Sequence, residues 1–166
     1  MSEVQDNITL SSEAKAAIDK ELKKYPADRK RSACMAALTF VQKENGGHLT
    51  NPLIEAVADY LEIPSIAAYE VASFYSMYEL APVGRHKVCL CTNVPCMLRG
   101  ADELGEHMKK RLKINYGETT KDGRITLKSV ECMGACVGGP MMQVDDDVYH
   151  ENLTTETVDK ILDDLT

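Results

Sequence analysis

Four cysteines form two close pairs whose spacing is typical of a metal or cluster site. Cys91 and Cys96 are separated by four residues, Cys132 and Cys136 by three, and 35 residues lie between the two pairs. Four thiolates from two loops are the ligand set of a tetrahedral metal site or an iron–sulfur cluster. The spacing therefore predicts a metal centre bound by these four residues.

The residues around the pairs are those of loops that can wrap a cluster. Gly134, Gly138 and Gly139 would let backbone N–H groups approach the sulfurs, and Pro95 stiffens the chain before Cys96. We expect Cys96 to lie at the start of a long helix, whose positive N-terminal end would favour a thiolate.

The four thiols alone do not decide between iron and zinc. A structural zinc site tolerates two to four residues between paired ligands, although the chain around these pairs can form a full core without a metal. A redox dithiol of the thioredoxin type would require C-x-x-C, which neither pair has. A reducing compartment disfavours disulfides. We favour iron–sulfur and keep a zinc-stabilised interaction module as the alternative from a different class.

Two further cysteines are candidates for packing. Cys89 precedes Cys91 by two residues in a strand-like run, so both side chains would share one face and Cys89 could compete as a ligand. We interpret it as a small buried hydrophobe. Cys34 lies in an alanine-rich helical segment, and we expect it to pack in a core.

Length and composition indicate a globular cytoplasmic protein. The chain has 166 residues, 44% of them hydrophobic, and no apolar run approaches the roughly 18 residues needed to cross a bilayer. Residues 1–13 lack the basic and apolar regions of a secretory signal. We therefore expect no direct membrane insertion.

The formal charge of −7 is concentrated in residues 145–166, which hold eight acids and one base. We interpret this acidity as a solvated face. An acidic balance without a basic stripe also argues against nucleic acid as a partner.

Helical periodicity dominates residues 1–81, which predicts an N-terminal bundle. The expected helices run from Ser11 to near Pro26, Asp28 to Asn45, Thr50 to Leu61 and Pro64 to about Leu80. On the second helix, Ala33, Ala37, Phe40 and Val41 are expected to share the buried face.

The fourth predicted helix carries four of the nine aromatic residues of the chain. Core packing and contact with a partner both remain open for Tyr69, Phe74, Tyr75 and Tyr78.

Residues 82–166 alternate between strand and helix patterns, which predicts a small α/β sandwich resembling thioredoxin. The expected order is a strand, a helix, a second strand, a hairpin around an acidic turn and a last helix. The corresponding ranges are His86–Leu90, 97–113, Arg124–Val130, Met141–Val144 with Val148–Tyr149, and Thr154–Leu165.

Five segments occur in one order and at one spacing: YPADRKRSACMAAL, Gln42 with Glu44–Gly47, VASFYSMYELAPVGRHKV, CTNVPCMLRGADEL and ECMGACVGGPMMQV. Together they resemble the small [2Fe–2S] subunit of the NADH-oxidising module of respiratory complex I, from about Leu10 to the C-terminus. The resemblance implies an α+β chain in which a helical bundle (1–81) is followed by a thioredoxin-like [2Fe–2S] ferredoxin domain (82–166).

By the family motifs, Cys91, Cys96, Cys132 and Cys136 would bind one [2Fe–2S] cluster, and Cys89 falls outside the pattern. The resemblance also implies an electron-carrying role beside a larger FMN- and NADH-binding subunit, docked partly through the N-terminal helices and peripheral to the inner membrane. No G-x-G-x-x-G motif follows a strand, so we do not expect this chain to bind NADH itself. Related subunits serve NAD-linked hydrogenases and formate dehydrogenases, which the cysteines do not separate.

Overall fold

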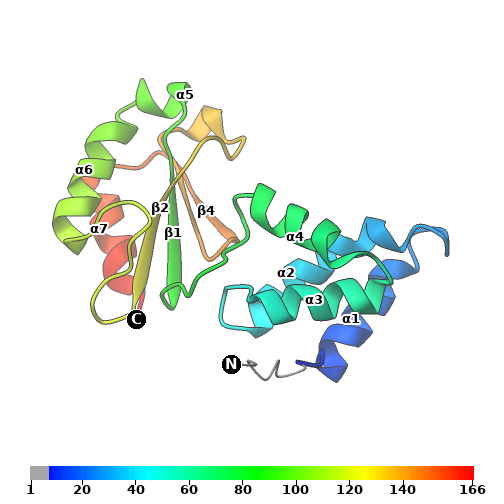
Figure 1. Cartoon of the computed structure of the whole chain (residues 1–166). Coiled ribbons are helices and arrows are strands. Elements are labelled where there is room, and N and C mark those ends of the chain that lie inside the picture. Colours follow the sequence, from blue (N-terminus) through cyan, green and yellow to red (C-terminus); the bar gives the residue numbers. More distant parts are fainter. Residues whose placement is uncertain (1–7) are drawn as a thin grey trace. The chain divides into compact units, whose positions relative to one another are not determined.

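The computed structural model describes residues 8–166. The chain divides into two compact units, Met1–Pro82 and Val83–Thr166, which are described separately (Figure 1). The expectation that no secretory signal is present rests partly on residues 1–7, which lie outside the described residues. Within residues 8–166, no helix is long and apolar enough to span a membrane.

The described part of the first unit is helical, as predicted. Its elements are α1 (Ser12–Leu22), the 3₁₀ turn η1 (Lys30–Ala33), α2 (Cys34–Glu44), α3 (Asn51–Leu61) and α4 (Ser65–Phe74). The Ser11 hydroxyl accepts a hydrogen bond from the Ala14 N–H at 2.9 Å, so the predicted N-cap of α1 is confirmed. Pro52 lies in the first turn of α3, where its missing N–H is harmless.

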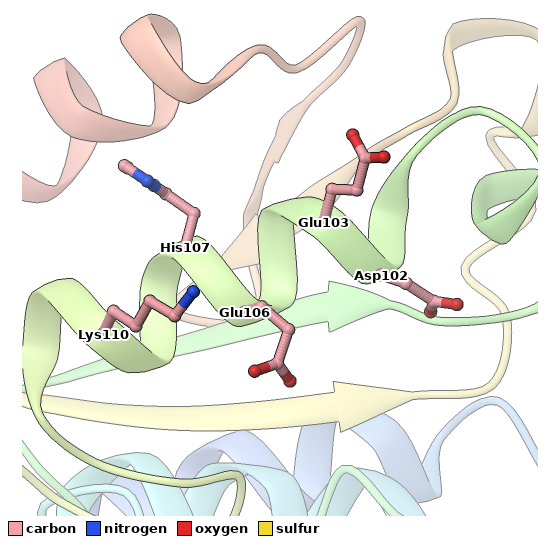
Figure 2. Close-up of a pocket in the computed structure, with 5 residues that line it drawn as sticks. All are labelled: Asp102, Glu103, Glu106, His107 and Lys110. Atoms are coloured by element: carbon pink, nitrogen blue, oxygen red, sulfur yellow. The ribbon is translucent and has the colours of Figure 1, made fainter.

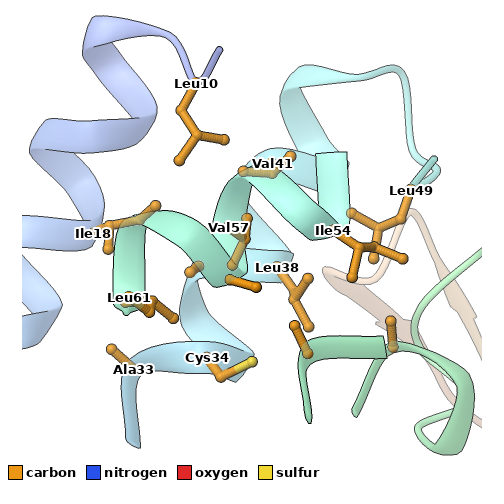
Figure 3. Packing of buried hydrophobic residues seen from close by; sticks show 14 of the residues in the cluster. Leu10, Ile18, Ala33, Cys34, Leu38, Val41, Leu49, Ile54, Val57 and Leu61 are labelled. Atoms are coloured by element: carbon orange, nitrogen blue, oxygen red, sulfur yellow. The ribbon is translucent and has the colours of Figure 1, made fainter. Parts of the chain in front are cut away.

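Aliphatic side chains from all four helices fill one core (Figure 3). Ile18 of α1, Leu38 of α2 and Leu61 of α3 are fully buried. Cys34 belongs to the same cluster, so its predicted packing role is confirmed. Burial raises the pKa of its thiol, as expected for a thiol that packs as a hydrophobe.

The second predicted helix is shorter than expected. Residues 30–33 form a 3₁₀ turn ahead of α2, in which the Ser32 N–H bonds to the Arg29 carbonyl three residues back. Phe40 was expected on the buried face of α2, and this was wrong: it is 38% exposed, whereas Leu38 and Val41 are buried.

The fourth helix ends at Phe74, not at Leu80, because the following backbone finds other partners. The side-chain amide of Gln42 donates to the Met77 carbonyl at 3.0 Å and accepts from the Glu79 N–H at 2.8 Å. The Glu79 carbonyl then accepts from the Leu49 N–H at 2.7 Å. These bonds attach the segment that follows α4 to α2 and to the loop at Leu49.

The second unit contains a four-stranded mixed sheet in the order β2-β1-β3-β4. The strands are β1 (His86–Cys91), β2 (Ile125–Val130), β3 (Met142–Val144) and β4 (Val148–His150). β1 pairs with β2 in parallel and with β3 antiparallel, and β3 and β4 form the predicted hairpin. The predicted order of elements is confirmed.

Helices α6 (Ala101–Leu112) and α7 (Thr155–Asp164) cover one face of this sheet (Figure 1). Leu104 and Met108 of α6 and Val158 of α7 pack on Val88 and Leu127 in one cluster. As the crossover between parallel strands, α6 brings the chain back to begin β2 beside β1.

The long helix predicted over 97–113 is interrupted, which is a correction. Residues Val94–Met97 form a separate single turn, α5, and the long helix α6 begins only at Ala101. Gly100 separates the two with φ 96°, a left-handed conformation that glycine adopts at no steric cost. Cys96 therefore lies in the short turn, and the helix-dipole argument made for it does not apply.

Removing the Gln42 amide should destabilise the first unit. Gln42→Ala would remove the side-chain hydrogen bonds to the Met77 carbonyl and from the Glu79 N–H in a part-buried site. Unsatisfied buried groups cost about 1–3 kcal/mol each, so we expect a loss of that order in the free energy of unfolding. Urea denaturation followed by circular dichroism measures it. Lys43→Ala, at an exposed neighbouring position, is the control, and equal midpoints for the two variants would contradict the prediction.

His86 should make stability depend on pH. Its ring nitrogens lie 2.8 Å from an Asp145 carboxylate oxygen and 3.1 Å from the Thr166 carbonyl oxygen. The Asp145 hydrogen bond is the main cause that raises the pKa of His86 above 6.5, and burial opposes it. The protonated ring therefore stabilises the fold fully below the unfolded-state pKa, and this contribution disappears as the pH rises through the folded-state pKa. As the pH rises from below 6.5 through the folded-state pKa of His86, the urea midpoint of the wild type should fall relative to that of His86→Gln; parallel curves would exclude the effect.

Candidate metal centre

The parallel pairing of β1 and β2 brings the two cysteine loops to the same edge of the sheet. Cys91, the last residue of β1, is in register with Val130, the last residue of β2. The Thr92 N–H donates to the Val130 carbonyl at 2.9 Å, and the Cys91 thiol lies 3.7 Å from the Glu131 carbonyl oxygen. Residues that follow these two strand ends must therefore lie next to one another.

The first loop carries Cys91 and Cys96, and both thiols are buried. They belong to one small cluster with Ala101 and Met141. The Cys96 N–H bonds to the Asn93 carbonyl at 2.9 Å, which closes the turn that returns the chain toward Cys91.

The second loop carries Cys132 and Cys136, and both are exposed. The Gly134 N–H donates to the Cys132 sulfur at 3.4 Å, as expected for a glycine near a ligand. Gly134 has φ 78°, so this tight turn requires a residue that tolerates the left-handed conformation. The Tyr149 hydroxyl, from β4, donates to the Met133 carbonyl at 3.1 Å and attaches the loop to the sheet.

The two thiols of the first loop are neighbours. Cys91 and Cys96 interact directly, and Cys136 lies close enough to act electrostatically on Cys96. Among residues 8–166, no three His, Cys, Asp or Glu side chains are grouped as a metal site in this arrangement of the loops. The assignment of all four cysteines as ligands therefore stays a prediction.

The surroundings of Cys96 fit a group that carries positive charge. Burial, followed by the neighbouring Cys91, raises the pKa of the Cys96 thiol, while a hydrogen bond from the Met141 N–H lowers it. A thiolate here is unfavourable alone and becomes favourable when metal ions bind the sulfur. An ideal Cβ on Gly139 would stand 3.2 Å from the Cys96 sulfur, so glycine leaves room for a sulfur-bound group.

Cys89 is buried, as predicted, in the middle of β1. Its register partners are Lys128 of β2 and Gln143 of β3, so it lies within the paired part of the sheet. Its exclusion from the ligand set stays a prediction.

A surface hollow on α6 is lined by charged side chains and His107, not by cysteines. Its lining side chains come from a single helix and point away from one another rather than toward a common point (Figure 2). They are Asp102, Glu103, Glu106, His107 and Lys110. His107 is already bonded to Asp159 of α7 at 2.7 Å, so this hollow contributes no convergent set of ligands.

Sequence reasoning missed Arg99, which joins the two loops. Its guanidinium donates to the carbonyl oxygens of Val137 at 2.8 Å and Gly139 at 3.2 Å. A lone arginine three residues after a cysteine carries no recognisable signal, because its partners are backbone atoms about 40 positions away.

The family model described as "Thioredoxin-like [2Fe-2S] ferredoxin" matches residues 18–166. The chain is 47% identical over 144 residues to an NADH-quinone oxidoreductase subunit from Rickettsia bellii, a match that covers 87% of this chain and 86% of that protein. It is 43% identical to "NADH dehydrogenase [ubiquinone] flavoprotein 2, mitochondrial" of Dictyostelium discoideum, covering 89% of this chain and 60% of that protein.

Among solved structures, part of an NAD⁺-reducing [NiFe]-hydrogenase has the same fold. The TM-score is 0.65 with 18% sequence identity, over 77% of this chain and 22% of the hydrogenase chain. At that identity the likeness concerns the fold alone.

The family match spans most of the chain and includes both cysteine loops and the sheet that joins them. The chain therefore belongs to the thioredoxin-like [2Fe–2S] ferredoxin family, whose cofactor is the [2Fe–2S] cluster that the family resemblance implied.

Proposed function

We propose that this chain is the [2Fe–2S] electron-transfer subunit of an NADH:quinone oxidoreductase. Its cluster would accept one electron from a reduced flavin on a larger NADH-binding subunit and later return it. The hydride chemistry of NADH would belong to that flavin, so this chain would be a carrier and not a catalytic subunit.

The observation that carries the proposal is the meeting of two cysteine loops at one sheet edge, in a chain 47% identical to a subunit of NADH-quinone oxidoreductase. The loops supply soft sulfur donors, which iron–sulfur clusters require. The same subunit of an NAD-linked hydrogenase is the alternative. It is less favoured because that likeness is limited to 18% identity.

We propose Cys91, Cys96, Cys132 and Cys136 as the cluster ligands. Two of the thiols are buried against the sheet, and the other two lie in a glycine-rich loop. In iron–sulfur proteins, hydrogen bonds to the sulfurs and solvent access set the reduction potential. The backbone N–H group of Gly134 already donates to one of the four sulfurs, that of Cys132.

The exposed rim of the cysteine loops supports docking on another protein. Val94, Leu98 and Val137 are 58%, 77% and 93% exposed. Apolar side chains gathered beside a redox centre are what an electron-transfer partner would cover.

The first unit carries a second exposed apolar surface at α4 and the segment after it. Of the four aromatics in question, Tyr78 is buried and bonds through its hydroxyl to the Met35 carbonyl at 2.8 Å. Tyr69, Phe74 and Tyr75 are exposed, with Phe74 at 80%. We propose that these three contact the flavin-bearing subunit.

Spectroscopy of the full-length chain tests the cluster. After anaerobic reconstitution with iron and sulfide, the oxidised protein should be red-brown. Dithionite should produce an S = 1/2 EPR signal, because antiferromagnetic coupling between the ferric and the ferrous iron of the reduced pair leaves a net spin of 1/2. Serine at position 91, 96, 132 or 136 should disrupt the signal, whereas Cys89→Ser should preserve it.

Two results would overturn these assignments. A colourless protein with stoichiometric zinc after reconstitution would replace the electron carrier with a zinc module. A cluster that survives in Cys91→Ser and is lost in Cys89→Ser would move the ligand from position 91 to position 89.

Co-purification tests the partner. Phe74→Ser should reduce recovery of the flavoprotein subunit with this chain several-fold, because a side chain that is 80% exposed would lose its contact area without disturbing the core. Tyr25→Ser, at another partly exposed aromatic of the same unit, is the matched control. Equal flavin content in both preparations would exclude a docking role for Phe74.

A further inference from the structure

Arg99 connects the two cysteine loops across the candidate cluster site. It follows Cys96 by three residues, and one of its guanidinium nitrogens donates to both the Val137 and Gly139 carbonyls in the second loop. The first of these residues directly follows Cys136. A single side chain from the first loop thus bonds to the backbone of the second loop just after Cys136.

Each of the four backbone carbonyls from Val137 to Pro140 accepts a hydrogen bond, and Arg99 supplies two of these bonds. The Gly138 carbonyl accepts from the Asn152 N–H at 2.6 Å, and the Pro140 carbonyl accepts from the Leu153 N–H at 3.0 Å. The other two carbonyls bond to Arg99. The chain after β4 therefore holds the segment from one side and Arg99 holds it from the other.

The Arg99 side chain and the Cys96 sulfur both approach Gly139. The point where a Gly139 Cβ would stand is 3.2 Å from that sulfur, 3.5 Å from Arg99 Cδ and 3.4 Å from the Cys136 carbonyl oxygen. Among residues 8–166, no carboxylate forms an ion pair with Arg99. The Glu151 carboxylate packs on Gly138 of the same segment.

A cation in this place affects the electron equilibrium of an iron–sulfur centre. Four thiolates make the cluster negative, and one-electron reduction of one iron from ferric to ferrous adds a further negative charge. A fixed positive charge nearby stabilises the reduced form more than the oxidised form, which raises the reduction potential.

We propose that Arg99 is a positioning residue with a second, electrostatic role: it clamps the cysteine loop 132–139 against the first loop and raises the reduction potential of the cluster. The inference rests on the proposed function, because it requires a cluster bound by these loops. Beyond that function, the inference assigns to Arg99 both the ordering of the loop 132–139 and an influence on the reduction potential of the cluster.

Three full-length variants test the proposal. Arg99→Gln removes the charge and the double clamp, and Arg99→Lys keeps the charge but cannot reproduce the guanidinium geometry. Lys110→Gln, at an exposed position on α6, is the control with the same change in net charge. Hydrogen–deuterium exchange of residues 131–141 in the cluster-free chains reports loop order. EPR-monitored redox titration of the reconstituted chains reports the potential.

In Arg99→Gln we expect loop exchange at least fivefold faster than in Lys110→Gln, and an equilibrium constant for one-electron reduction at least threefold lower. A tenfold change would correspond to about 59 mV for a one-electron couple. Arg99→Lys should exchange faster than wild type but keep a potential close to it.

Identical exchange in Arg99→Gln and Lys110→Gln would overturn the clamp, and identical potentials would overturn the electrostatic role. If Arg99→Gln holds no cluster, hydrogen–deuterium exchange in the cluster-free chains decides whether Arg99 orders the loop, and the titration of Arg99→Lys against Lys110→Gln tests the charge. A wild-type chain that gives no EPR signal would contradict the proposed function, while the exchange experiment would still test the clamp.

Discussion

The structure of the site depends on one interaction, the parallel pairing of β1 with β2. Because the two strands run in the same direction and end in register at Cys91 and Val130, the loops that follow them leave the sheet at the same edge. An antiparallel pairing would have placed the cysteine pairs at opposite ends. Helix α6 makes the pairing possible as the crossover between the strands.

Charge is the second constraint on this site. The sheet edge buries the thiols of Cys91 and Cys96, and burial raises the pKa of the Cys96 thiol. In the proposed cluster site, iron and nearby positive groups would offset that penalty: the Met141 backbone lowers the pKa of Cys96, and Arg99 is the nearby cation. The same groups would influence how readily the cluster accepts an electron.

Much of this organisation was predictable from local sequence patterns. The N-cap at Ser11, the β3–β4 hairpin around its acidic turn and the last helix follow from capping, turn and periodicity signals within a few residues. The predictions failed where a distant group competed with local propensity. Helix α4 stops at Phe74 because Gln42 and Leu49 bind the backbone beyond it. Cys96 lies outside the long helix because Gly100 interrupts the helical backbone. The spacing of apolar residues over 97–113 does not reveal that one residue adopts a left-handed conformation.

The chemistry of the candidate site can be read from the residues alone: four thiols in two pairs, glycines beside them and the motifs of a [2Fe–2S] family. The type of ligand and its short-range spacing can be read directly from the amino-acid sequence. Three other features depend on the folded units: how the pairs meet, which aromatics of the first unit are exposed, and the bonds by which Arg99 joins the two loops. Strand register and bonds to backbone carbonyls about 40 residues away arise from packing of a whole unit, and no local residue pattern encodes them.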